Sequence, residues 1–210
     1  MGRMSRVGRA LAIGLFLLLS TTIGAAQTVW FDALAARVDG QPILVSDVSL
    51  NERLFGSGKA FFELSPGDRD AAVGSLIEQH LLLVEATRFG VAQPDDQTIR
   101  ETTAALRPRL GADAERVGDV GLNTRVRDFL WVDAFVDARI RAFVMIRDSR
   151  VAERFVAQGA PLTGETGAQA RARIREELAT EEAATRLARY LERLTGRAEI
   201  KRYPLSDPPF

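Results

Sequence analysis

Two short segments at opposite ends of this 210-residue chain carry patterns that suit strands of one sheet. The Asp-Gly pair at 39–40 is flanked by apolar residues and favours a type I′ hairpin turn, because both central residues of that turn need positive φ. A lone hairpin is marginal in water and needs a third strand or a covering helix. Residues 198–201 (AEIK) alternate apolar and charged side chains, as a half-buried strand does. We therefore expect the C-terminal segment to pair with the hairpin and to enclose a helical middle.

The residues between these segments show the start and stop signals of helices. Ser46 is the expected N-cap of a helix that stops at residues 56–58 (GSG). Ser65 and Pro66 are expected to open a second helix, which stops at Gly90. Further helices are expected from Pro94 to the region of Pro108, over residues 124–148 with Asn123 as N-cap, over residues 151–157 and over residues 168–194. The sequence thus predicts a mainly α fold with a small β element that joins the N-terminal hairpin to the C-terminal strand.

The helix expected over residues 124–148 carries two neighbouring apolar stripes. The first stripe holds Val126, Phe129, Val132, Val136, Ile140 and Phe143. The second stripe holds Trp131, Phe135, Ala138, Ala142 and Met145. So wide an apolar arc implies packing on two sides, or one packed side and one binding side. The polar remainder includes Asp133, Asp137 and Arg141 at four-residue steps, which predicts a ladder of surface ion pairs.

The order of these and further motifs resembles that of SurA-type periplasmic chaperones, whose N-terminal core is related to the C-terminal domain of trigger factor. The matching segments are ARVDGQPILVSD (36–47), LIEQHLLLVEA (76–86), FGV (89–91), PDDQTI (94–99), VAERF (151–155) and YLERLTGRAEI (190–200). The similarity covers nearly all of the chain after residue 26. It implies a single helical domain over residues 27–210, with a SurA N-terminal or trigger factor C-terminal-like core.

Many SurA-type proteins also carry a parvulin prolyl isomerase domain before the last helix. The resemblance places that point at residues 158–167, a segment far too short to hold such a domain. A parvulin active site also uses paired histidines and a Gly-Gly-rich strand, whereas this chain has one histidine, His80. We therefore expect the isomerase domain to be missing.

Residues 1–26 have the pattern of a cleavable secretory signal peptide. Three arginines precede an apolar run at 10–19, and small residues end the segment at Ala26. The run is short for a membrane span, although an uncleaved N-terminal anchor is the alternative. Cleavage removes three of 28 basic and none of 28 acidic residues, which leaves a net charge of −3 and no electrostatic attraction for nucleic acid. We expect a periplasmic protein with no stable membrane insertion after cleavage.

The sequence shows no motif for catalysis or for a cofactor. It has neither a G-x-x-x-x-G-K-[ST] phosphate loop nor a G-x-S-x-G nucleophile elbow. A single histidine and the absence of cysteine make a metal site unexpected. His80 is either a pH-sensitive switch or, in the favoured interpretation, an imidazole at the edge of the core with one hydrogen bond. We expect no enzyme, no cofactor and no metal.

Apolar surface is therefore the remaining candidate for function. Phe61 and Phe62 follow the Gly-Ser-Gly turn and either dock into the core or form an aromatic lip. Trp131 and Phe135 either pack in the core or line a groove, and together with Phe55 these are the candidate client-binding residues. The resemblance implies an ATP-independent holdase for unfolded or extended clients, with outer-membrane proteins as the client class. The alternative is a structural or assembly protein that uses the same fold to bind a dedicated partner or to form a homodimer.

Overall fold

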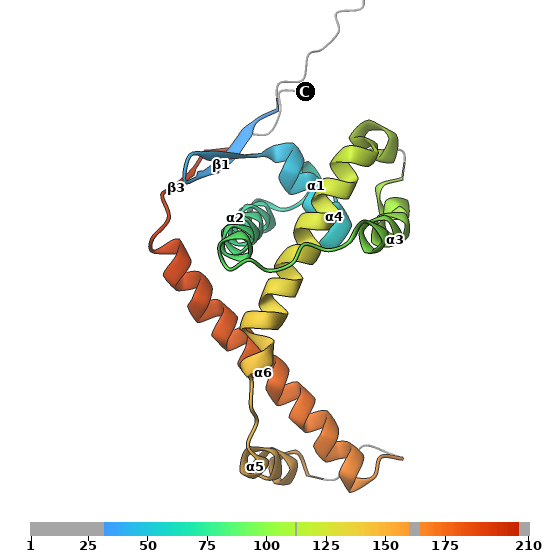
Figure 1. Cartoon of the computed structure of the whole chain (residues 1–210), viewed down its shortest axis with the longest axis vertical. Helices are drawn as coiled ribbons and strands as arrows, with labels where there is room; N and C mark the ends of the chain where they lie inside the picture. The colour runs from blue at the N-terminus through green and yellow to red at the C-terminus, as the bar shows by residue number, and fades with distance from the viewer. Residues whose placement is uncertain (1–31, 112, 160–163, 206–210) are drawn as a thin grey trace, which may run out of the picture. The chain divides into compact units, whose positions relative to one another are not determined.

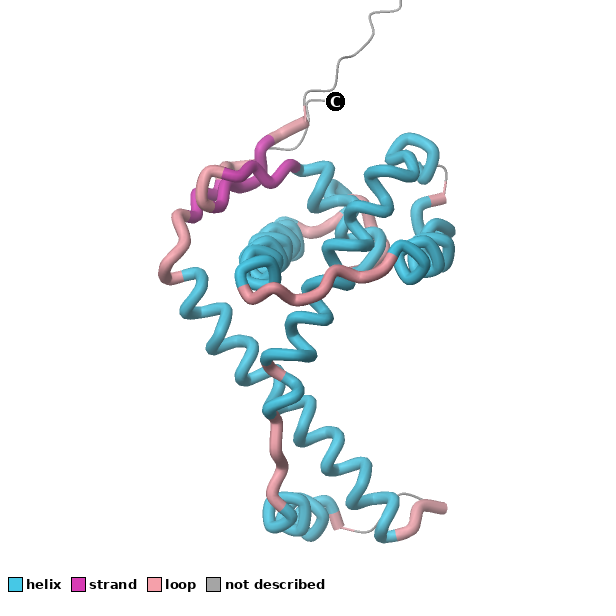
Figure 2. Tube along the Cα trace, viewed as in Figure 1, coloured by secondary structure: helices cyan, strands magenta, loops and turns pink. Residues whose placement is uncertain are grey.

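The computed structural model describes residues 32–111, 113–159 and 164–205, all within the unit Asp32–Phe210. The signal peptide expected over residues 1–26 lies outside these described residues. In the described ranges, no helix combines the length and the apolar character that crossing a membrane requires. The described part is mainly helical with a small antiparallel sheet (Figures 1 and 2), which confirms the predicted mainly α class with a small β element.

The sheet has the strand order β2-β1-β3, with β1 spanning Leu34–Val38, β2 spanning Gln41–Leu44 and β3 spanning Ile200–Arg202. Val38 pairs with Ile200 in antiparallel register. Past the ladder, the amide of Tyr203 donates to the Ala35 carbonyl at 3.0 Å. The predicted pairing of the hairpin with the C-terminal segment is therefore confirmed, and Figure 1 shows β3 beside β1.

The hairpin turn has the predicted type I′ character. Asp39 has φ 47° and Gly40 has φ 83°, so both central residues are in the left-handed region. Nothing lies within 4 Å of the position of a Cβ at Gly40, so this glycine is needed for its φ and not for space. Asp39 also holds the C-terminal segment: its amide donates to the Glu199 carbonyl at 2.9 Å and its side chain accepts from the Glu199 amide at 2.8 Å.

The helices of the described ranges follow the expected order along the chain. They are α1 (Val45–Phe55), η1 (Phe61–Glu63), α2 (Pro66–Arg88), α3 (Asp96–Leu106), η2 (Arg107–Leu110), α4 (Asp113–Arg139), η3 (Arg141–Phe143), α5 (Asp148–Gln158) and α6 (Gly167–Thr195). The short loop expected over residues 158–167 separates α5 from α6, and residues 160–163 of it lie outside the described residues.

The predicted helix caps are right at α2 and wrong at α1. Ser65 Oγ accepts a hydrogen bond from the Asp68 amide at 3.2 Å, and Gly90 follows the end of α2 with φ 63°. In α1 the N-cap is Leu44, while Ser46 lies inside the helix and its hydroxyl donates to the Asp32 carboxylate. The cap of α3 is Asp95, whose carboxylate accepts from the Thr98 amide at 2.9 Å, so this helix begins slightly later than expected.

Helix α4 begins earlier and ends earlier than the predicted range of 124–148. Asn123 lies inside it, and a kink at Gly118 (φ 69°, ψ 163°) divides it into two segments. The helix ends at Arg139, where no glycine or proline marks the end. Arg186 Nη1 on α6 donates to the Phe143 carbonyl at 2.7 Å, which satisfies a backbone acceptor just past this end. A contact with a distant helix, rather than a local signal, thus accompanies the termination.

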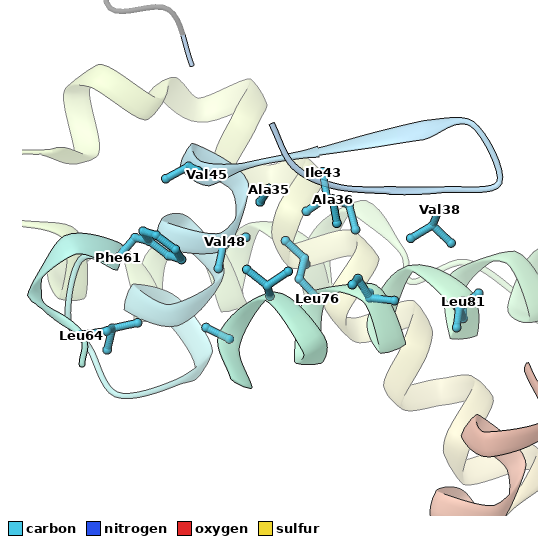
Figure 3. Packing of buried hydrophobic residues seen from close by; sticks show 13 residues of the cluster. Ala35, Ala36, Val38, Ile43, Val45, Val48, Phe61, Leu64, Leu76 and Leu81 are labelled. Carbon is cyan, nitrogen blue, oxygen red and sulfur yellow. The ribbon is translucent and has the colours of Figure 1, made fainter. Parts of the chain in front are cut away.

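The core lies between the sheet and the helices that cover it. Figure 3 shows Ala36, Val38 and Ile43 of the hairpin above the helix that carries Leu76 and Leu81, all members of one buried cluster. A second cluster joins α1, α3 and α4, a third joins α2, α4 and α6, and a fourth joins α5 to α6. The third cluster positions the candidate site, because it fixes α6 against α2 and α4.

Candidate functional site

Two hollows that share lining residues lie beside α4 and α6, and α1 and α2 also line the first of them. The first has a volume of about 300 Å³ and the second about 350 Å³. Both are lined by Val136, Arg141 and Leu187, and the two hollows together are here called the α4–α6 groove. Its remaining lining comes from two sets of residues: Asn51, Glu52, Phe55, Gly56, Ser75, Glu78, Gln79, Leu82, Phe129, Val132, Asp133 and Leu191 in the first hollow, and Val144, Glu176, Ala179, Thr180, Ala183 and Ala184 in the second.

Helical periodicity explains how these side chains reach one surface. On α4 the groove is lined by residues 129, 132, 133 and 136, the spacing of one helix face. On α6 residues 176, 179, 180, 183, 184 and 187 repeat the same spacing. The α6 residues are mostly small (Ala179, Ala183, Ala184), which leaves room between the helices. The groove is therefore mainly apolar, and its width depends on the alanines of α6 that line it.

An aromatic pair lies at the α1 side of the groove. Phe55 and Phe129 stack with ring centroids 4.0 Å apart and an angle of 5° between the ring planes. Phe129 remains 37% exposed although it packs against Phe55. An exposed aromatic face of this kind can accept an apolar or aromatic side chain of a bound chain.

The groove also contains more carboxylates than cations. Glu52, Glu78, Asp133 and Glu176 line it, whereas Arg141 is the basic residue among its described lining. Arg141 is held by the predicted ladder, since its Nη1 donates to Asp133 at 3.0 Å and also to Asp137. These hydrogen bonds raise the pKa of Arg141, so it stays charged. At Glu78 the dominant effect is desolvation by burial, which raises the pKa of this carboxyl, while the charge of Arg202 lowers it.

A partly buried hydrogen bond connects α6 to α2 beside the groove. The Tyr190 hydroxyl donates to Oε2 of Glu85 on α2, and Arg88 Nη1 lies 3.3 Å from the other oxygen of this carboxylate. Glu85 is only 7% exposed, so its charge depends on these two partners. Desolvation and the bond to Glu85 raise the pKa of Tyr190 to about 12. The tyrosine therefore remains a protonated donor at any physiological pH.

The five predicted client-binding residues do not form one site. Phe55 lines the groove. Phe61 is 1% exposed and Phe135 is 0% exposed, so the prediction that they present a binding surface is wrong. Phe61 belongs to the buried cluster that contains the hairpin residues. Phe135 belongs to the third cluster, and its ring packs against those of Phe89 and Tyr190.

Phe62 and Trp131 also lie away from the groove lining. Phe62 is 43% exposed, and its ring lies beneath the Arg69 guanidinium at 5.4 Å. Arg69 also donates to the Phe62 carbonyl at 2.9 Å, which fixes this turn instead of leaving it as a free lip. The indole of Trp131 is half-buried and donates to the Val91 carbonyl at 2.8 Å. Both rings therefore have structural partners.

Sequence reasoning missed the residues of α4 and α6 that line the groove. Phe129, Val132 and Val136 belong to the first apolar stripe of α4, whereas the selected Trp131 and Phe135 belong to the second. The stripe itself was visible in the sequence. Neither stripe stays open as a whole, because Val126 and Val136 of the first and Phe135 of the second are all buried. The contacts with α6 that bury individual residues have no local signal in the sequence.

A smaller and more polar pocket of about 160 Å³ surrounds His80. It is lined by Pro42, Ile43, Asp47, Leu76, Gln79, His80, Leu83, Arg125 and Asp128. Desolvation lowers the pKa of His80, while the charges of Asp39 and Asp128 raise it. The imidazole is half-buried, as expected for the edge of the core, but among the described residues none makes the single hydrogen bond that was expected.

No metal centre is evident in the part of the chain that the structure describes, because no three His, Cys, Asp or Glu side chains are grouped as ligands there. Comparison with known proteins gives no family for the chain. No protein-family model matches the sequence, and a search of curated proteins finds no significant relative.

Proposed function

We propose that this chain is an ATP-independent holdase-type chaperone of the periplasm that binds unfolded or extended segments of other proteins, without isomerase or other enzymatic activity. The resemblance of its motif order to SurA-type chaperones suggests outer-membrane proteins as clients. The single observation that carries the proposal is the α4–α6 groove, two mainly apolar hollows that share lining residues, with the exposed ring of Phe129 in the first.

The groove suits weak and reversible binding. An affinity in the micromolar range corresponds to about 8 kcal/mol. Fully burying one large apolar side chain contributes about 1.5–3 kcal/mol, and association itself costs about 4–15 kcal/mol. Several apolar side chains of a client must therefore enter the two hollows together, next to Phe129, Val136 and Leu187. Release needs no nucleotide, because each contact is small and non-directional.

A substitution that fills the groove tests this proposal. Ala184 is exposed on α6 and lines the second hollow, whereas the exposed Ala188, one turn further along, lines neither. We expect the unchanged chain and the control Ala188→Trp to suppress light scattering by several unrelated aggregating proteins, and Ala184→Trp to lose most of this effect. Equal suppression by both tryptophan variants, or no suppression by the unchanged chain, would contradict the proposal.

A dedicated partner or a homodimer is the second candidate function. Large apolar side chains are also exposed outside the groove, at Phe143, Met145 and Val156. Exposed apolar side chains of this size can contribute to a fixed interface. One tight and stoichiometric complex, together with no suppression of aggregation, would favour this candidate over the holdase.

A further inference from the structure

We propose that the α4–α6 groove selects client segments in which apolar residues are combined with lysine or arginine. This inference rests on the proposed function of the groove as a client site and adds the chemistry of the preferred client. It is argued from the charges of the groove and from the unpaired acceptors in its lining.

The charge of the groove is negative although the chain as a whole is balanced. The full sequence has 28 basic and 28 acidic residues. The groove lining has the four carboxylates of Glu52, Glu78, Asp133 and Glu176 against the single guanidinium of Arg141. The excess of negative charge is therefore local to the surface where the apolar side chains are open. A bound segment with positive charge meets a complementary potential there.

Two of these carboxylates, Glu78 and Glu176, are without a hydrogen bond or ion pair among the described residues, although the charge of Arg202 acts on Glu78. Arg141 neutralises Asp133, and Ser57 donates to Glu52 Oε2 from its amide and its hydroxyl, both at 3.2 Å. Within the described residues, neither Glu78 nor Glu176 makes a side-chain hydrogen bond or an ion pair. Glu78 lines the first hollow and Glu176 the second, so one open carboxylate serves each half of the groove.

The first hollow also contains hydrogen-bond acceptors that nothing in the described chain satisfies. Asn51 is 8% exposed, and its Oδ1 is buried without a donor. Gln79 Oε1 is also buried without a donor, and both residues line the first hollow. A buried polar group without a partner is costly, so a ligand that brings N–H donors gains these bonds on arrival. Lysine and arginine supply donors and no acceptors, which matches this set.

Matched peptides test the selection. Three peptides share one apolar sequence and an uncharged dye, and differ only in a pair of positions that hold arginine, serine or glutamate. Binding is measured by fluorescence anisotropy with the purified chain. The two peptide arginines can form two solvent-accessible ion pairs with groove carboxylates. Since such pairs are weak, we expect the arginine peptide to bind only about fivefold tighter than the serine peptide. The glutamate peptide should bind more weakly than the serine peptide, and high salt should shrink both differences.

Variants assign the preference to the groove. Glu78→Gln should reduce the advantage of the arginine peptide over the serine peptide. Glu153→Gln removes an exposed carboxylate of α5 outside the groove and should change neither. Ala184→Trp should weaken all three peptides, because it fills the apolar channel that they share.

The outcomes separate this inference from the proposed function. If the three peptides bind equally and Ala184→Trp abolishes binding, the groove is a client site but the preference for basic segments is wrong. If no peptide binds, the proposed function and the inference both fail. The oligomeric state of the same preparation, measured by size and mass with and without peptide, identifies other occupants. If the chain is a homodimer and the arginine peptide separates it, the groove is assigned to a second copy of the chain. Binding only after removal of residues 1–26 assigns it to the basic, apolar leader of the chain itself. Either result overturns the proposal.

Discussion

At the scale of single residues, the Tyr190–Glu85 hydrogen bond connects α6 to α2. Tyr190→Phe keeps the ring and removes the donor, which leaves the buried carboxylate of Glu85 with Arg88 alone. Hydrogen bonds to charged groups contribute about 1.5–3 kcal/mol, and we expect the free energy of unfolding in urea to fall by about this amount. The control is Tyr203→Phe, whose hydroxyl has no bond to any described residue. Equal losses in the two variants would contradict the role of this bond.

His80 gives the chain a pH dependence with a defined sign. Its pKa in the folded protein is below the ordinary value of about 6.5, so its contribution to stability is complete above pH ~6.5 and is lost as the pH falls through the folded pKa. The pKa values of Asp128 and Glu78 are raised by burial, and these groups act in the opposite direction, losing stability as the pH rises. Both carboxyls are present in wild type and in His80→Gln, so the difference between the two proteins reports the contribution of His80.

We therefore expect wild type to lose more stability than His80→Gln when urea unfolding is measured at neutral pH and again at mildly acidic pH. The local charges that face the imidazole are those of Asp39, Asp47, Arg125 and Asp128. An identical change in the free energy of unfolding for the two proteins would show that His80 does not titrate differently on folding.

At the scale of elements, the two glycines at the start of α4 have opposite roles. Gly118 has φ 69° and ψ 163°, a region that is almost restricted to glycine, so Gly118→Ala should destabilise by about 1–3 kcal/mol. Gly121 lies in the helix without a positive φ, and a Cβ there would meet Val117 Cγ1 at an ordinary 3.5 Å. Gly121→Ala should therefore stabilise by about 0.5–1 kcal/mol. Thermal unfolding measures the change in stability of each variant. Changes of the same sign in both would contradict the different roles of the two glycines.

The same region shows which elements the sequence could predict. The hairpin, the Ser65 cap and the Gly90 stop depend on backbone preferences of one or two residues, and all three were predicted. The predicted start of α4 was wrong because Asn123, taken as the N-cap, lies inside a helix that begins at Asp113 and continues past the kink at Gly118. Its end was wrong because the break after Arg139 has no local signal and coincides with the Arg186 contact from a helix far along the chain.

At the scale of the molecule, the pairing of the hairpin with the C-terminal segment could be predicted and the open apolar surface could not. The C-terminal segment can be recognised as a strand because apolar and charged residues alternate over residues 198–201. Phe129 and Phe135 both lie on apolar stripes of α4, so sequence alone could not say that Phe135 would be buried and Phe129 left at the surface. Leu187, Tyr190 and Leu191 of α6 pack against a cluster that contains residues of both stripes, so burial is decided by contacts with a distant helix and not by the stripe to which a residue belongs.

The most direct measurement of the holdase account is photo-crosslinking to a defined unfolded client from two aromatic positions. Benzoylphenylalanine replaces Phe129, which lines the groove, or Phe62, which is similarly exposed but lines neither hollow. The account predicts crosslinks from position 129 that excess unlabelled client suppresses, and few from position 62. Crosslinks from position 62 with none from position 129 would contradict it.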